Sequence, residues 1–211
     1  MRATYSMIIC EIQYVGKIGT GSTIYQGTNR YSITGFSQQQ HKLEVKNNNF
    51  FVRGYVVSDN AGDSYDMVFT GININRSWKS DAAWFGDYIS TYAGATLGGA
   101  TDAQAHAAAR AAAETGRLLP GTPAFQNAFN QVIANPDLGS GSRFQDTSKY
   151  YHGDANYNFS HLWDVVDVQV GGSYRKYELN SGGTIYTDFD GTIPYSEFGV
   201  YTQLQKEFDL N

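Results

Sequence analysis

The stretch that decides the fold class is DVVDVQVGGSYRK, residues 164–176. Every second residue from Val166 to Tyr174 is apolar or glycine, and the residues between them are polar or glycine. This period of two is the signature of a β-strand with one apolar and one polar face. EFGVYTQLQKEF, residues 197–208, repeats it. In a water-soluble sandwich the apolar face would pack on another sheet, whereas in an outer-membrane barrel it would contact lipid and the polar face would line the lumen.

The composition favours exposed β-structure. Aromatic residues make up 15% of the 211 residues, with 16 Tyr and 23 Gly against only 4 Pro, as in barrels with aromatic girdles and close turns. The net charge of −5 argues against a nucleic-acid partner. The single cysteine, Cys10, excludes an internal disulfide, and its neighbours Met7–Ile9 predict a small apolar filler. We find no apolar run long enough for a transmembrane helix.

The ends of the chain bear on export. The apolar run Met7–Cys10 is too short for a signal peptide, and Glu11 interrupts it. An exported protein needs such a signal, so we expect the chain to begin within a longer gene. The residues Asp209-Leu210-Asn211 indicate the beginning of a turn, and we expect another strand after it.

Further strands are predicted on both sides of a central region. Residues 5–18 alternate, and residues 41–56 predict a hairpin around the turn Asn47–Asn49. The turn-rich segment Gln26–Phe36 is predicted to be a surface loop. After the central region the alternation resumes in residues 149–159, followed by a turn at Ser160–Trp163.

The central region, residues 64–146, is predicted to be a helical insertion between the strands. Residues 64–77 fit a helix capped by Ser64 and fit a strand almost as well; we favour the helix. Helical spacing recurs in residues 84–92, before a Gly-rich piece at Gly94–Gly99. A capping box of Thr101 with Gln104 opens a helix to Thr115, and Thr122-Pro123 opens one that Asn135-Pro136 ends.

No catalytic or metal site can be recognised, so we predict neither an enzyme nor a cofactor. The four histidines lack metal-ligand spacing; His106 is read as a surface residue, and His152 with Asp154 as a solvated pair rather than a lumen site. Asp188-Phe189-Asp190-Gly191 matches part of a calcium loop, but the other ligands are missing and a turn is the better interpretation. The polar strand faces supply candidate lumen residues, for each of which a solvated sheet face is an equal alternative: Arg53, Asp167, Gln169, Arg175, Gln203 and Gln205.

The amino-acid sequences of several segments resemble a known family. KIGTGSTIYQGTNRYSITGFSQQQHKLEVKNNNFFVRGYVVSDNAGDSYDM (17–67), ARAAAETGRLLPGTPAFQNAF (109–129), KYYHGDANYNFS (149–160), VVDVQVGGSYRKYELNSGGTIYTD (165–188) and EFGVYTQLQKEF (197–208) resemble, in order, the barrel of TonB-dependent outer-membrane receptors of the Bacteroidetes type. Members of that family also carry a signal peptide, a TonB box, a plug domain and a barrel of about 22 strands. None of the N-terminal parts is recognisable here.

The resemblance implies a mainly β fold, an antiparallel meander that forms part of a large transmembrane β-barrel in the outer membrane. Residues 1–63 and 147–211 would each supply about three strands, and residues 64–146 would form a long helical extracellular loop. The parent protein would bind TonB through parts absent here and take up a siderophore, glycan or peptide, in contact with membrane lipid and lipopolysaccharide. Aromatic loop residues would suit ligand contact, although packing is an alternative use: Trp78, Trp84, Tyr88 and Tyr92. A soluble, secreted, lectin-like β-module with a helical lid remains the second hypothesis.

Overall fold

The computed structural model describes residues 10–163 and 165–207. Four sequence predictions therefore lie outside the described residues: the beginning of the first strand with Met7–Ile9, the first residue of the stretch 164–176, the contribution of Phe208, and the turn at the end of the chain.

The described chain contains seven strands and four helices in the order β1–β4, α1–α4, β5–β7. The elements are β1 Glu11–Gln26, β2 Arg30–Lys46, β3 Phe50–Asn60, β4 Tyr65–Asp66, α1 Met67–Trp78, α2 Asp81–Leu97, α3 Asp102–Ala113, α4 Pro123–Ala134, β5 Lys149–Asn158, β6 Asp167–Leu179 and β7 Ile193–Gln205. The protein is thus mainly β, with all helices between β4 and β5, as the sequence predicted.

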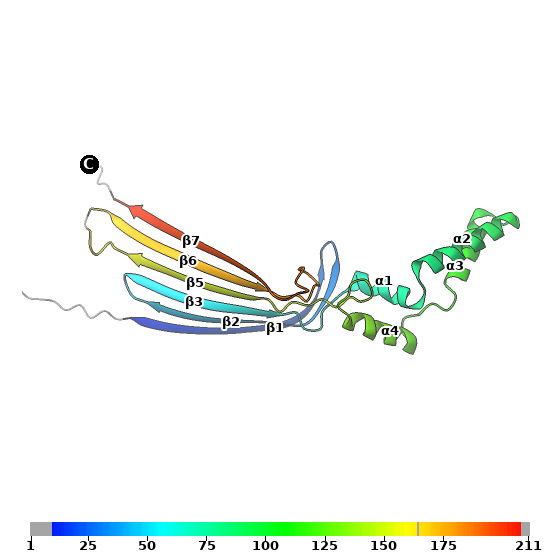
Figure 1. The fold of residues 1–211 in the computed structure, drawn as a ribbon, viewed down its shortest axis with the longest axis horizontal. Coiled ribbons are helices and arrows are strands. Elements are labelled where there is room, and N and C mark those ends of the chain that lie inside the picture. Colours follow the sequence, from blue (N-terminus) through cyan, green and yellow to red (C-terminus); the bar gives the residue numbers. More distant parts are fainter. Residues whose placement is uncertain (1–9, 164, 208–211) are drawn as a thin grey trace, which may run out of the picture. The chain divides into compact units, whose positions relative to one another are not determined.

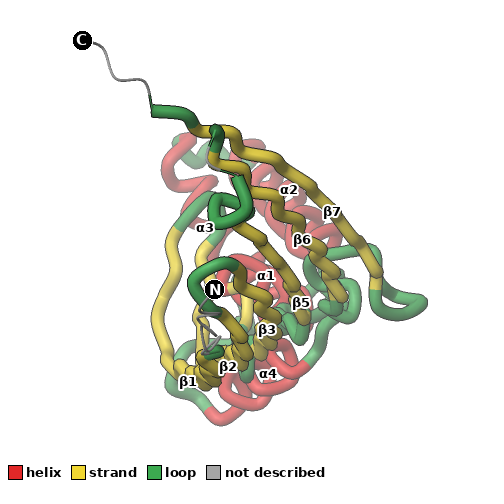
Figure 2. Tube along the Cα trace, turned by 90° about the vertical axis from the view of Figure 1, so that its left-hand side faces the viewer, coloured by secondary structure: helices red, strands yellow, loops and turns green. Residues whose placement is uncertain are grey.

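The strands form one antiparallel sheet, which is open. Its order is β1-β2-β3-β5-β6-β7, with the short β4 paired to β2. Figures 1 and 2 show these six longer strands side by side in that order. Within the described residues β1 and β7 are edge strands and do not pair with each other, so the sheet is a meander and not a closed barrel.

The register gives this sheet two chemically different faces. Residues directly opposite each other in neighbouring antiparallel strands share a face. One such row contains Leu43, Gly54, Gly153, Tyr174 and Phe198, and the next row on the same face contains Val45, Val52, Ala155, Gly172 and Val200. The rows between them belong to the other face and contain Glu44, Arg53, Asp154, Ser173 and Gly199. The alternation read from the sequence therefore runs in register across five strands.

The chain divides into two compact units. The sheet unit holds the described residues up to Ser22, residues Thr34–Gly62, and those from Gln145 on; the helical unit holds Thr23–Ile33 and Asp63–Phe144.

Capping side chains set the helix starts in the helical unit. Asp66 caps α1 by accepting hydrogen bonds from the N–H groups of Val68 and Phe69. The predicted cap, Ser64, is wrong, because residues 65–66 pair with β2 and delay the helix. The predicted caps of α3 and α4 are confirmed: Thr101 and Gln104 form a capping box, and Thr122 accepts from the N–H of Phe125.

The core of the helical unit is small. Ile74 of α1 packs with Ala128 and Val132 of α4, and Leu118, Phe125 and Phe129 surround them. In α3 the methyl groups of Ala105, Ala109 and Ala113 are fully buried, and this helix packs against α2. The close approach of α2 and α3 therefore rests on small side chains.

Three further sequence predictions are wrong. Residues 26–36 do not form a loop; β1 continues to Gln26 and β2 begins at Arg30, with Gly35 in the left-handed region (φ 67°) and its N–H donating to the hydroxyl of Ser22 at 3.0 Å. Cys10 is exposed and fills no core. The piece 94–99 is not a separate segment, because α2 runs through it to Leu97. Among the described helices we find none long and apolar enough to cross a membrane.

Candidate functional site

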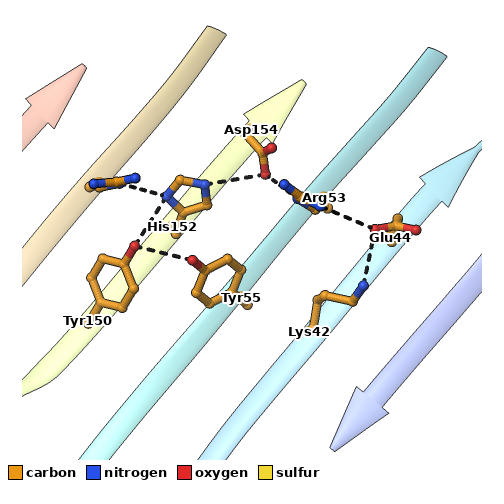
Figure 3. Close-up of polar contacts among 8 residues, drawn as sticks. Lys42, Glu44, Arg53, Tyr55, Tyr150, His152 and Asp154 are labelled. Carbon is orange, nitrogen blue, oxygen red and sulfur yellow. Dashed lines mark hydrogen bonds and ion pairs between the residues drawn. The ribbon is translucent and has the colours of Figure 1, made fainter. Parts of the chain in front are cut away.

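The polar face of the sheet carries a continuous network of charges across five strands, from β2 to β7. Figure 3 shows its central part, from Lys42 to His152. Arg53 Nε donates to Asp154 Oδ1 at 2.7 Å, and its Nη1 lies 4.0 Å from Glu44 Oε2. Glu44 is buried and also accepts from Lys42 Nζ at 3.1 Å. Opposite charges alternate along this network, so Glu44 and Asp154 each have a cationic partner.

His152 stands at the centre of this network, between Arg175 and Asp154. Arg175 Nε lies 3.2 Å from His152 Nδ1, and His152 Nε2 lies 3.3 Å from Asp154 Oδ1. A guanidinium can only donate, so Nδ1 accepts and the ring proton sits on Nε2, facing the carboxylate. The prediction of a solvated His152–Asp154 pair is wrong, because the side chain of His152 is only 7% exposed.

A cluster of tyrosines extends the network on the same face. Tyr150 Oη lies 3.2 Å from Tyr55 Oη and 3.4 Å from His152 Nδ1, and its ring stacks on Tyr177 at 5.0 Å. Beyond it, the ring of Tyr177 lies 5.9 Å from that of Tyr195. None of these tyrosines was predicted as a site residue, although their positions in the alternation of β3, β5, β6 and β7 place them on the polar face.

All six predicted lumen residues lie on this one face. Arg53 and Arg175 belong to the network described above, and Arg175 also approaches Glu197 at 3.7 Å. The other four form two cross-strand pairs nearer the opposite end of the strands, Gln169 with Gln203 and Asp167 with Gln205. The structure thus gathers these residues on one surface.

The opposite face of the sheet is apolar and exposed. Phe198 is 85%, Val200 82% and Leu204 68% exposed. The middle row, from Val45 to Val200, is aliphatic or glycine. Aromatic residues border it on both sides: Tyr14, Tyr151, Tyr174 and Phe198 toward one end, and the ring chain Tyr157–Phe159–Trp163 toward the other.

The predicted ligand-contact residues of the helical unit form two adjoining clusters. Trp78 and Trp84 line one pocket of about 290 Å³ together with Lys79, Phe85 and Arg117. The ammonium of Lys79 lies 4.8 Å from the Trp78 ring centre, a cation–π distance. Sequence analysis missed both cations. On the rim, the hydrogen-bonded guanidinium of Arg76 keeps the pKa of Asp81 below its ordinary value.

Tyr88 and Tyr92 belong to the second cluster, around His106. Tyr88 stacks on Trp84 at 5.2 Å and its hydroxyl lies 2.6 Å from His106 Nδ1. Tyr92 donates to Asp102 at 2.5 Å, and this hydrogen bond raises the pKa of the Tyr92 phenol. His106 is a surface residue, as predicted, with a side chain 52% exposed. Within residues 10–163 and 165–207 we find no group of three acidic, His or Cys side chains placed to hold a metal ion.

The loop after β6 closes around a buried carboxylate. Asp188 accepts hydrogen bonds from the hydroxyl and N–H of Ser181 and from the N–H groups of Gly182 and Gly183. Burial alone would raise the pKa of Asp188, but these four donors outweigh it and hold the pKa well below the ordinary value. Both carboxylate oxygens are used within the chain, which supports the turn predicted here over a calcium site.

Comparison with known proteins returned no relationship: no protein-family model, no curated protein and no solved structure matches this chain.

Proposed function

We propose that this chain is a segment of the β-barrel wall of a TonB-dependent outer-membrane receptor, which takes up a siderophore, glycan or peptide and is not an enzyme. The observation that carries the proposal is the exposed apolar face with its aliphatic centre and aromatic borders. Outer-membrane barrels present such a band to lipid, with aromatic girdles at both interfaces.

The height of the band suits a bilayer. From Tyr151 of β5 to Phe159, the residue after its end, the apolar positions extend over roughly 27 Å at ~3.4 Å per residue, which is roughly 20 Å across the bilayer at a tilt of ~40°. Barrels present an apolar band of about 25 Å. The two heights are similar, which supports the proposal that these strands cross the membrane with their apolar positions in its hydrocarbon layer.

The polar face would then line the lumen. A network of ion pairs that includes buried Glu44 and His152 is costly to bury in lipid, whereas a lumen supplies water and polar partners to it. The open edges β1 and β7 fit a wall continued by further strands, since an unpaired edge has no hydrogen-bond partners inside a bilayer.

The helical unit would serve as an outer loop that contacts the nutrient. Its pocket combines two tryptophans with Lys79 and Arg117, which suits stacking on a flat or apolar ligand that also carries negative groups. The long connections 61–148 and 180–192 leave the same end of the sheet, together with the short turn 27–29, whereas the chain reverses after Lys46 and after Asn158 at the opposite end. Barrels place their long loops outside and their short turns in the periplasm.

The alternative is a soluble β-module, and one observation counts against it. The described strands form a single sheet, so no second sheet among the described residues packs on Phe198 and Val200. A soluble sandwich buries such positions between two sheets.

Single-cysteine labelling tests the proposal. In a Cys10→Ser background, cysteines are placed at Val200 and Leu204 on the apolar face and at Glu197 and Gln203 on the polar face, and the chain is isolated in membranes of a Gram-negative host. We expect a lipid-soluble maleimide to label the first pair and a water-soluble maleimide the second, because the faces alternate with a period of two.

Two results would contradict the proposal. A chain that fails to float with lipid vesicles, or positions 200 and 204 protected from both reagents, would favour the soluble module. The proposed role in transport needs a separate test. Deletion of the gene in its native host should abolish growth when a siderophore is the sole source of iron, or a glycan or peptide the sole source of carbon or nitrogen. Unaffected growth on all three would refute a role in uptake.

A further inference from the structure

A second pocket of the helical unit lies between α1 and α4, which pack side by side (Figure 1). Its volume is about 290 Å³, near the lower end of the range of ~300–1,000 Å³ typical of small-ligand sites. The apolar part of its lining comprises Tyr65, Met67, Ile74, Leu118, Phe125 and Phe129. Among the described residues, Arg117 is the one charged residue that lines it. We call this space the α1–α4 pocket.

The pocket is open because the core beneath it is small. Ile74 is buried, but Leu118, Phe125 and Phe129 pack against this core with only part of their surface covered. On α1, a Cβ at Gly71 would meet no atom within 4 Å. Glycine is unfavourable in the body of a helix, and here it leaves a space that a larger side chain would fill.

Arg117 supplies a positive charge that its neighbours balance only in part. Its Nη1 lies 3.6 Å from Glu114 Oε2, which is longer than a hydrogen bond. Glu114 is also shared, because its Oε1 lies 3.6 Å from Arg110 Nη1. Two guanidinium groups thus face one carboxylate, which leaves a net charge of +1 on the three side chains. The side chain of Arg117 is 43% exposed, so its donors remain accessible to a ligand.

We propose that the α1–α4 pocket binds an apolar carboxylic acid, with an aromatic or branched aliphatic group between Ile74, Phe125 and Phe129 and the carboxylate on Arg117. A guanidinium and a carboxylate form strong, charge-assisted hydrogen bonds, whereas an uncharged apolar ligand would leave the guanidinium without a partner. A free aryl or alkyl carboxylic acid carries this combination of groups, and so does the C-terminal residue of a peptide. The site adjoins the pocket of Trp78 and Trp84, with which it shares Asn75 and Arg117.

Methionine methyl NMR tests this site in the full chain. Of its three methionines, only Met67 lies among the described residues, and it lines the pocket. The chain, with isotope-labelled methionine methyl groups, is titrated in detergent micelles with 3-phenylpropionate and with 3-phenylpropionamide, its uncharged counterpart of the same shape. We expect the acid to shift the Met67 signal with a dissociation constant of about 1 mM, as is usual for so small a ligand. The amide should bind about tenfold more weakly.

The residues around Glu114 provide matched variants. Arg117→Gln should weaken binding of the acid about tenfold and remove its preference over the amide. Arg110→Gln takes the other guanidinium from Glu114 but lies outside the pocket, so it should weaken binding at most about threefold and keep the preference. Glu114→Gln should strengthen binding of the acid about two- to fivefold, because it removes the carboxylate that competes for Arg117.

Filling the pocket tests where the ligand lies. Gly71→Leu places a side chain in the open space and should weaken binding about tenfold. The control is Gly86→Leu, the same change at an exposed glycine of α2 where a Cβ would also meet no atom within 4 Å; it should leave binding unchanged. Gly71→Ala, with a smaller side chain, should give an intermediate loss and replaces the leucine variant should that one fail to fold.

A peptide identifies the source of the carboxylate. Acetyl-alanyl-phenylalanine carries the same phenyl and carboxylate groups at a peptide C-terminus. Tighter binding than that of 3-phenylpropionate would assign the site to peptide C-termini, and weaker binding would assign it to free acids. In the proposed receptor the first result would make a peptide the nutrient, an extension that rests on the proposed function, whereas the binding itself does not.

The outcomes that overturn this inference differ from those that contradict the proposed function. A Met67 signal that the acid does not shift, equal affinity for acid and amide, or unchanged binding in Gly71→Leu would each overturn the site. A chain that floats with vesicles but binds no acid retains the barrel proposal. A chain that binds the acid but does not float contradicts the proposed function alone.

Discussion

The packing of α2 on α3 leads to a prediction that the replacement Ala109→Leu tests. Ala109 is fully buried, midway between Ala105 and Ala113 along the seam with α2. No residue of α2 is itself buried, so the contact is shallow and depends on a short distance between the helices. A leucine at this position must either push the helices apart or adopt a strained rotamer.

The magnitude follows from the burial. Overpacking costs about 1–3 kcal/mol, and full separation would also forgo roughly 0.8 kcal/mol for each of the buried alanine methyl groups. We therefore expect Ala109→Leu to lower the free energy of unfolding of the helical unit by about 2 kcal/mol. For a unit of this size, that is a decrease in melting temperature of about 8–16 °C.

Tryptophan fluorescence provides the assay. In a Trp163→Phe background, the remaining tryptophans, Trp78 and Trp84, both lie in the helical unit. The control is Ala108→Leu, the same change at the exposed neighbouring position of α3. Leu and Ala have similar helix propensities, so it should cost less than about 0.5 kcal/mol. Equal effects of the two replacements would refute the packing of α3 on α2.

Three further predictions concern single side chains. Arg53→Leu should destabilise the sheet by about 1–2 kcal/mol in chemical denaturation, and Asp154→Asn should cost less in that variant than in the unmodified chain, because the ion pair is already lost there; equal costs in the two backgrounds would argue against the pair. Asp66→Ala should cost the helical unit about 1–2 kcal/mol, and Asp66→Asn much less, in the fluorescence assay, because an amide oxygen also caps. Since the pKa of Asp188 is lowered, the stability that its carboxylate contributes is full above the unfolded pKa of about 4 and is lost only as the pH falls toward the folded pKa. The N–H of Gly182 should therefore remain protected from hydrogen exchange at pH 4, relative to an unfolded chain at the same pH, and should lose this protection in Asp188→Asn at every pH. Loss of protection in the unmodified protein at pH 5 would contradict this.

Several elements could be predicted because their signals are local. The caps Thr101 and Thr122 satisfy the first N–H groups of their own helices, so a few neighbouring residues suffice to locate them. The alternation within β3, β6 and β7 assigned every lumen candidate to the polar face of its strand, because side chains in a strand alternate whatever the partner strand is.

The failures arise where a distant partner decides. Ser64 is a good cap by its chemistry, but Tyr65 and Asp66 pair with β2, and the helix begins two residues later. The segment around Gly35 looks like a loop because of its turn residues, whereas pairing extends both strands through it. His152 looks like a solvated residue until Tyr55 and Arg175 are placed opposite it by the register.

By itself, then, the sequence determined the strand period, the caps and the separation of polar from apolar positions, since each depends on residues near in the chain. Only the tertiary structure decided the register, and with it the charge network from Lys42 to Glu197. A shift of one residue in pairing would move every side chain to the other face. The strand period allows such a shift, and the cross-strand contacts of the folded sheet exclude it.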